Sequence, residues 1–229
     1  MSRRAVLVAG FGGLAVGAGG TEIGRALAET GPAAESHLAS PGEELMTEHG
    51  VLKRLLLAYR AIHDRLAAGE SVTAGVVTDS AELIADYVES FHEGLEEAYV
   101  FPRVAAEQPA LIRTLLVQHD HGRHLTAAIQ AAASAGLSEA TVRAALASDI
   151  AAFVRMYEPH EAWEDTVVYP ALRAVTAQRT LDELAERFAE LENRQYGDSA
   201  LTAILQRVAG VEDELGIGDI AACTPSGVA

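Results

Sequence analysis

Apolar side chains recur at steps of three and four residues along four long stretches of the chain. This spacing places them on one face of an α-helix, which has 3.6 residues per turn. The first stretch opens with a helix-start pattern, a serine cap at Ser40 followed by Pro41 and by Glu43 at the third position. The pattern predicts amphipathic helices over residues 40–69, 79–102, 109–134 and 138–170.

Three prolines lie at or within these stretches. Pro102 and Pro170 follow the last apolar positions of the second and fourth stretches, so we expect those helices to end there. Pro159 lies inside the fourth stretch and is expected to kink it just before His160.

Short connectors between long helices favour antiparallel neighbours. We therefore predict an all-α fold, an up-down-up-down four-helix bundle over residues 44–175, with one or two additional C-terminal helices over residues 178–214. The amphipathic pattern of the C-terminal stretch suits packing on the outside of the bundle or against a partner. A linker at residues 29–43 and a flexible tail at residues 215–229 complete the predicted organisation.

The composition narrows the function classes. The 229 residues are 49% hydrophobic and only 5% aromatic, which suits a helical core. The formal net charge of −16 repels phosphate backbones, so we expect no nucleic-acid partner. The single cysteine, Cys223, lies in the tail, which excludes an internal disulfide or a zinc site built from cysteines.

Residues 1–28 have the composition of an export signal. Arg3 and Arg4 precede a modestly apolar run diluted by glycine, with no acid before Glu22. The pair resembles the twin-arginine signal of proteins that are exported after folding. The run is too short and too weakly apolar for a stable membrane span. We predict an exported protein of the periplasm or cell envelope, which would be cytoplasmic if the leader were not functional.

An internal repeat carries the candidate chemistry. Two segments of the form His-x-x-x-Glu end in Phe-Pro and Tyr-Pro dipeptides, and a further histidine lies on the helical stretch before each. The two segments are 68 residues apart and the two single histidines are 70 residues apart. The repeated residues are His49, His92, Glu96, His119, His160 and Glu164.

These side chains indicate a metal site. Residues four apart in a helix stand one above the other, so each His-x-x-x-Glu segment presents an imidazole and a carboxylate to one point. The histidines lie on apolar helix faces, where a buried polar group without a partner costs roughly 2–7 kcal/mol. Imidazole with carboxylate suits iron, manganese or zinc, so the pattern predicts a cation at the bundle centre.

The order of these motifs resembles the hemerythrin-like family of HHE cation-binding domains over about residues 44–173. The resemblance implies a bundle that holds two non-haem iron ions, bridged by oxo or carboxylate groups, with Glu96 and Glu164 as the bridging carboxylates. It implies two histidines at each iron, His49 and His92 at one, and His119 and His160 at the other. Members of the family bind O2, sense oxygen or iron, or react with peroxide or nitric oxide. A small diatomic or peroxide ligand is therefore the expected partner.

Two departures from oxygen-carrying hemerythrins bear on the function. Those proteins have a second histidine four residues after the third-helix histidine, where this chain has Arg123. They also have an aspartate five residues after the fourth-helix histidine, and here both Glu164 and Asp165 are candidates, of which the repeat favours Glu164. Two histidines per iron leave a position open on each metal, which favours peroxide or redox chemistry over O2 storage.

Neighbouring histidines are weaker candidates for the site. His119 fits the apolar face better than His121, which falls off that face. We expect His63, His124 and His37 to be solvated.

Four further residues are candidates for contact with the ligands. Tyr99 and Tyr157 lie one turn from Glu96 and from His160 on the same faces, as hydrogen-bond donors or as plain core. Glu93 and Glu161, about 100° round from the preceding histidines, are either extra ligands or, as we favour, part of a solvated face. Gly122 either leaves space near the metals or serves packing alone.

Three alternative functions remain. A non-catalytic iron or oxygen binder or sensor would use the same ligands. A ferritin-like oxidase needs Glu-x-x-His twice, and only Glu89 with His92 fits. A metal-free structural bundle would leave the repeat of buried ligand residues unexplained.

Overall fold

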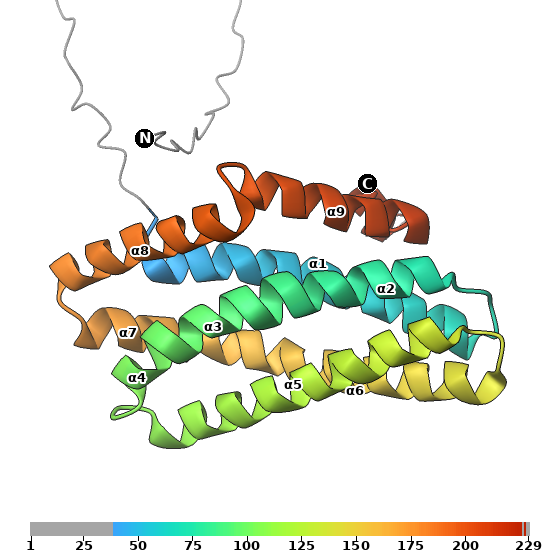
Figure 1. The fold of residues 1–229 in the computed structure, drawn as a ribbon, viewed down its shortest axis with the longest axis horizontal. Coiled ribbons are helices and arrows are strands. Elements are labelled where there is room, and N and C mark those ends of the chain that lie inside the picture. The colour runs from blue at the N-terminus through green and yellow to red at the C-terminus, as the bar shows by residue number, and fades with distance from the viewer. Residues whose placement is uncertain (1–38, 226, 228–229) are drawn as a thin grey trace, which may run out of the picture. The chain divides into compact units, whose positions relative to one another are not determined.

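The computed structural model describes residues 39–225 and 227, so the predicted leader at residues 1–28 lies outside the described residues (Figure 1). All regular elements are helical and the described residues contain no strand, which confirms the all-α prediction. The elements are α1 (Pro41–Ala67), α2 (Ala74–Leu83), η1 (Ile84–His92), α3 (Glu93–Leu95), η2 (Glu96–Val100), α4 (Phe101–Val104), α5 (Pro109–Ala135), α6 (Ala140–Trp163), η3 (Glu164–Val168), α7 (Tyr169–Val175), α8 (Gln178–Tyr196), α9 (Ala200–Leu215) and η4 (Ile220–Cys223).

Four long rods surround one apolar core (Figure 1). The first rod is α1 and the third is α5. The second runs through α2, η1, α3, η2 and α4, and the fourth through α6, η3 and α7. Each rod packs against two others, because α1 contacts α6 and η1, while α5 contacts α6 and α2. Large side chains buried between the rods include Tyr59, Tyr157, Phe101 and Phe153.

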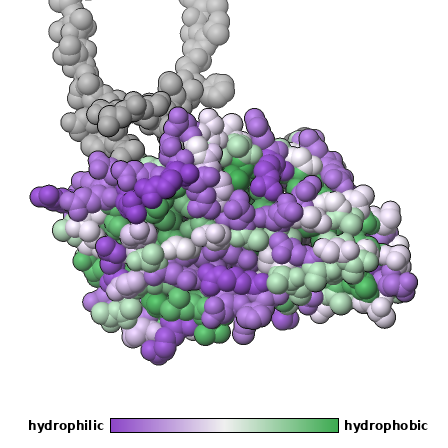
Figure 2. Space-filling view, in the orientation of Figure 1, coloured by the Kyte–Doolittle hydropathy of each residue, from purple (hydrophilic) through white to green (hydrophobic). Residues whose placement is uncertain are grey.

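α8 and α9 lie along the side of the rods formed by α1 and α2. α8 contacts α1, and α9 contacts both α1 and α2. Apolar side chains such as Phe188 and Val208 face inward, whereas the outer surface mixes hydrophilic and hydrophobic residues (Figure 2). Ile217 after α9 packs against the core, but Ile220 is 86% exposed. None of the described helices is long and apolar enough to cross a membrane.

The helix starts depend on local caps. The capping box at α1 forms as predicted, since Ser40 N–H donates to Glu43 Oε2 at 2.8 Å and Ser40 Oγ accepts from Glu43 N–H. The second helix was expected to begin at Asp79 but begins five residues earlier, at Ala74. Thr73 caps this earlier start, because its Oγ1 accepts a hydrogen bond from Val76 N–H at 3.2 Å.

The predicted helix ends at Pro102 and Pro170 are wrong. Both prolines lie in the first turn of a further helical segment, α4 and α7. Pro159, by contrast, was expected to lie inside its helix, and α6 does continue through it to Trp163.

The π-helical segments η2 and η3 explain how the chain passes these two prolines. A proline cannot donate to the carbonyl four residues back, and its ring crowds that carbonyl. Phe101 and Tyr169, which directly precede the prolines, donate their N–H groups five residues back, to the carbonyls of Glu96 and Glu164. The widened turn accommodates the ring, so the helix continues, and each of these glutamates begins a π-helical segment.

Gly122 in α5 serves the packing of a tyrosine. A Cβ at this position would lie 1.9 Å from the hydroxyl oxygen of Tyr157, which is buried. The substitution Gly122→Ala is therefore expected to lower the free energy of unfolding by about 1–3 kcal/mol, the usual cost of overpacking.

The matched control is Gly50→Ala in α1, where nothing lies within 4 Å of the added Cβ. Alanine there is expected to raise the free energy of unfolding by up to about 1 kcal/mol, because it favours the helix over glycine. Urea denaturation measures both, and equal effects would contradict the steric explanation.

Candidate metal centre

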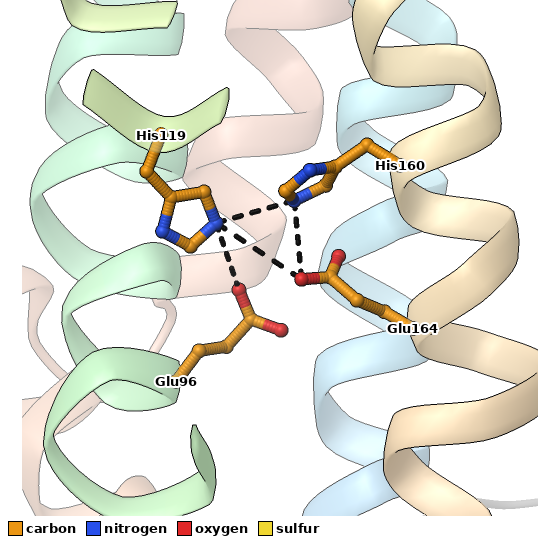
Figure 3. A group of neighbouring side chains, drawn as sticks. All are labelled: Glu96, His119, His160 and Glu164. Carbon is orange, nitrogen blue, oxygen red and sulfur yellow. Dashed lines mark hydrogen bonds and ion pairs between the residues drawn. The ribbon is translucent and has the colours of Figure 1, made fainter. Parts of the chain in front are cut away.

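The structure brings all six predicted ligand residues together. Each of the six side chains is buried, and they come from α1, η1, η2, α5, α6 and η3. These six residues alone make up two groups, in each of which one donor atom per residue lies within 4.8 Å of the others. One group is His49, His92 and Glu96, and the other is Glu96, His119, His160 and Glu164 (Figure 3).

Glu96 is shared by the two groups. Its Oε2 lies 3.6 Å from Nε2 of His92 and 3.6 Å from Nε2 of His119. Its other oxygen, Oε1, accepts a 2.8 Å hydrogen bond from the Tyr169 hydroxyl. One oxygen of Glu96 therefore faces both halves of the cluster.

Glu164 also spans the two halves. Its Oε2 lies 3.4 Å from Nε2 of His49, and its Oε1 lies 3.1 Å from Nε2 of His160. The neighbouring Asp165 points outward instead and pairs with Nδ1 of His49 at 2.7 Å. Glu164, rather than Asp165, therefore lies between the two halves of the cluster.

The two glutamates have buried oxygens without hydrogen bonds. Oε2 of Glu96 and both oxygens of Glu164 have no hydrogen-bond partner, although both side chains are fully buried. Burial and the nearby Glu164 carboxylate raise the pKa of Glu96 well above its usual value. Burial would also raise the pKa of Glu164, but the imidazoles of His160 and His49 hold it below its usual value. Cations between these oxygens and the four imidazoles would provide the missing partners.

Each histidine is oriented by an acceptor on its outer nitrogen. The four Nε2 atoms lie near the two glutamates, while every Nδ1 lies within hydrogen-bond distance of an oxygen from another rod. The Nδ1 partners are Asp165 for His49 (2.7 Å), Glu48 for His92 (2.7 Å), Glu97 for His119 (2.9 Å) and Gln118 for His160 (3.0 Å). Such contacts hold the Nε2 lone pair toward the centre, as in metal sites.

These four acceptors follow the internal repeat, but none was expected in this role, and Asp165 was expected only as an alternative to Glu164 as a ligand. Glu48 and Gln118 each directly precede a histidine of the site, and Glu97 and Asp165 each directly follow a glutamate of the site. Their repeated position beside ligand residues was the available signal. Helical periodicity does not detect this signal, because the residue next to an inward-facing one is expected to point away from the bundle centre.

Tyr169 breaks the symmetry of the two halves. Its hydroxyl oxygen lies 3.2 Å from Nε2 of His49, in addition to its bond with Glu96. The equivalent position in the first repeat is Phe101, which stacks on His119 at a ring distance of 5.4 Å, much as Tyr169 stacks on His49 at 5.6 Å. The tyrosine hydroxyl beside Nε2 of His49 therefore has no counterpart at the equivalent residue beside His119.

The expected solvated positions of Glu93 and Glu161 are wrong. Glu93 is 1% exposed and accepts from the Tyr157 hydroxyl at 2.6 Å and from Arg123 at 2.8 Å. Glu161 is also buried and forms an ion pair with Lys53. Both glutamates are buried because a base from the neighbouring rod reaches each of them.

The two tyrosine candidates differ. Tyr157 lies beside the cluster, with its ring 5.2 Å from that of His160. Tyr99 packs against Phe188 of α8, with a ring distance of 5.7 Å.

The remaining histidines lie apart from the groups described above. His121 is exposed, in contrast to the fully buried His119. His63 pairs with Asp64 beside it, and His124 contacts the carbonyl of Asp120. His37 lies outside the described residues.

The chain has only one of the two glutamates that the Glu-x-x-His motifs of a ferritin-like oxidase require, and that one is Glu89 before His92. Glu89 accepts a hydrogen bond from Thr126 at 2.5 Å and belongs to neither group of candidate ligands described above. The position that matches it before His160 is Tyr157.

The Tyr169 hydroxyl can be tested by its removal. Tyr169→Phe leaves Glu96 Oε1 without a donor, so the metal-free protein is expected to lose about 1–3 kcal/mol of unfolding free energy. Tyr59→Phe is the control, because Tyr59 is equally buried and its hydroxyl has no hydrogen-bond partner. Chemical denaturation in the presence of a chelator measures both, and equal losses would refute the role of the hydrogen bond.

Comparison with known proteins agrees with this geometry. The sequence model of the hemerythrin HHE cation-binding domain matches twice, at residues 40–147 and 110–216. The two matches begin 70 residues apart, which is the interval between His49 and His119. The second match therefore begins where α5 repeats α1.

Curated relatives extend the similarity along the chain. An uncharacterized protein of Mycobacterium bovis and uncharacterized proteins of two Mycobacterium tuberculosis strains are each 41% identical over 208 residues, which is 90% of this chain and 81% of the relative. No solved structure matches the chain. With its matches spanning residues 40–216, the chain belongs to the hemerythrin HHE cation-binding domain family.

Proposed function

We propose that the chain is a non-haem di-iron protein that reacts with a small uncharged oxidant, and that peroxide is the preferred one. The ligands would be His49, His92, Glu96, His119, His160 and Glu164. One observation carries the proposal: buried carboxylate oxygens without hydrogen bonds lie 3.1–3.6 Å from histidine Nε2 atoms. Polar atoms at such distances in a fully buried site are expected to share cations.

The donor set favours iron. The site contains imidazole and carboxylate but no thiolate, since Cys223 is exposed in the tail. Imidazole with carboxylate suits iron among the redox metals. Two carboxylates that each face both halves would bridge two ions, with Glu96 and Glu164 in that role.

The protein residues prepare this site before any ion binds. The four Nδ1 acceptors fix the imidazoles, so little reorganisation is required. The six ligand side chains are buried, and the Tyr169 hydroxyl donates its proton to Glu96 Oε1, with 2.8 Å between the two oxygens. A bound iron pair would supply electron exchange with O2, peroxide or nitric oxide.

Arg123 supports redox chemistry over O2 storage. It occupies the position of the extra histidine of oxygen carriers and reaches away from the Nε2 atoms, to Glu93 at 2.8 Å and Glu97 at 2.5 Å. The half with His119 therefore keeps two histidines, like the half with His49. Two histidines on each side would leave a coordination position for the oxidant.

Two further parts of the proposal concern fold and location. We propose the up-down-up-down order for the four rods, supported by their pairwise packing and short connectors. We also propose export through the twin-arginine-like segment at residues 1–28. That route carries folded proteins, so iron could be loaded before export to the periplasm or cell envelope.

The ligand assignment predicts the metal content of variants. The purified chain is expected to hold about two irons, and Glu96→Ala or Glu164→Ala to lose most of them, because each carboxylate bridges both positions. His63→Ala should keep the metal, since His63 lies apart from the candidate ligands. Elemental analysis per chain measures this, and full metal in both glutamate variants would refute the assignment.

The proposed reactivity predicts catalytic peroxide consumption. The iron-loaded chain is expected to consume many equivalents of peroxide per chain, and the metal-free chain and Glu164→Ala none above background. Peroxide loss and oxygen evolution measure the turnover. A stable, reversible O2 adduct without peroxide turnover would instead identify a binder or sensor.

A further inference from the structure

A groove between α5 and α6 leads to one half of the centre. Its cavity volume is about 370 Å³, within the range of small-molecule sites. Leu111, Leu115 and Trp163 form apolar parts of its wall. Gln118 and His160 also line it, and they are joined by the 3.0 Å contact from Gln118 Oε1 to His160 Nδ1. The groove therefore connects the surface with an imidazole whose other nitrogen faces the cluster.

The equivalent position in the first repeat is covered. The groove residues Pro159 and Trp163 correspond to Phe91 and Leu95 beside α1. Tyr196 at the end of α8 packs on Phe91 at a ring distance of 5.5 Å, edge to face. Leu95 is 3% exposed, whereas Trp163 is 54% exposed. α8 thus covers the first repeat, and no described element covers the same place on the second.

The lining of the open groove suits an uncharged molecule. Its eight residues include no aspartate, glutamate, lysine or arginine, on a chain with a formal net charge of −16. At the covered position the repeat has Glu44 and Glu48 in place of Thr114 and Gln118. Where the groove opens, the second repeat therefore has neutral side chains at two positions that are acidic in the first.

We propose that this groove is the entrance through which a small uncharged reactant of the peroxide or diatomic class reaches the half of the centre formed by His119 and His160. The proposal deepens the proposed function and rests on it for the identity of the reactant. Phe101 in place of a tyrosine adds to the argument, since the hydroxyl that contacts His49 Nε2 has no counterpart at the equivalent position in this half. The half with His49 and His92 is closed by α8 outside and bears the Tyr169 hydroxyl inside.

The test uses diethyl pyrocarbonate, a small uncharged reagent that acylates imidazole. His92 and His160 are both 3% exposed, so static exposure predicts equal modification. With metal removed from the full-length chain, mass spectrometry is expected to show His160 modified severalfold faster than His92. Equal rates, or a faster His92, would overturn the proposal.

Variants locate the route. Thr114→Phe fills the groove and is expected to slow modification of His160 severalfold, without changing that of His92. Val117→Phe is the matched control, because Val117 is 53% exposed on the same helix but does not line the groove. Tyr196→Ala uncovers the other side and should accelerate His92 alone. An equal effect of the two phenylalanine variants on His160 would overturn the proposal.

A second test of the groove uses the iron-loaded chain. Extraction of iron by 2,2′-bipyridyl, an uncharged chelator, is expected to slow in Thr114→Phe but not in Val117→Phe, with unchanged metal content in both. Iron that leaves both variants at the same rate would overturn the groove proposal and leave the di-iron proposal standing. A chain that binds no iron but keeps the His160 preference would overturn the proposed function and support the groove.

Discussion

Two fully buried carboxylates facing four imidazoles are the constraint on which the rest of this structure depends. Glu96 and Glu164 expose none of their surface, and three of their four oxygens have no hydrogen bond. Burial of unpaired carboxylates is so costly that a fold normally avoids it or gives them cations. The surrounding features suit that second solution. An oxygen at Nδ1 fixes each imidazole, and the Tyr169 hydroxyl donates a hydrogen bond to the remaining oxygen of Glu96. The π-helical segments that start at both glutamates allow the rods to continue past Pro102 and Pro170.

The convergence of the site could be predicted from the sequence because the information is local and repeated. Spacing of four residues places His92 with Glu96 on one helix face, and repetition of that segment in a second rod gives the matching half. The capping box at Ser40 is likewise a local pattern and forms as predicted. The all-helical class follows from the same periodicity, which a strand-rich fold would not show.

The errors arose where a residue depends on another rod. Glu93 and Glu161 lie off the ligand face, so periodicity assigned them to solvent, yet Arg123 and Lys53 reach them from neighbouring rods and permit burial. The role of Tyr169 could not be found, because its hydroxyl meets Glu96, a residue 73 positions earlier in the chain. The predicted helix ends at Pro102 and Pro170 were wrong for a different reason. A proline does not end a helix where the backbone can accommodate its ring, and at Pro102 and Pro170 the i to i−5 bonds supply a wider turn.

The differences between the repeats carry more functional information than their likeness. A duplicated ligand set by itself predicts two equivalent metal positions, each with two imidazoles and a share of both carboxylates. The chain departs from that equivalence in three ways. The Tyr169 hydroxyl contacts His49 and has no counterpart at the equivalent Phe101. The side chain behind His92 is Glu48, whereas the one behind the equivalent His160 is Gln118, and the helix α8 covers only the side of His49 and His92. The half with His49 and His92 is therefore the more enclosed of the two, so the repeats supply equivalent ligand residues but two unlike surroundings.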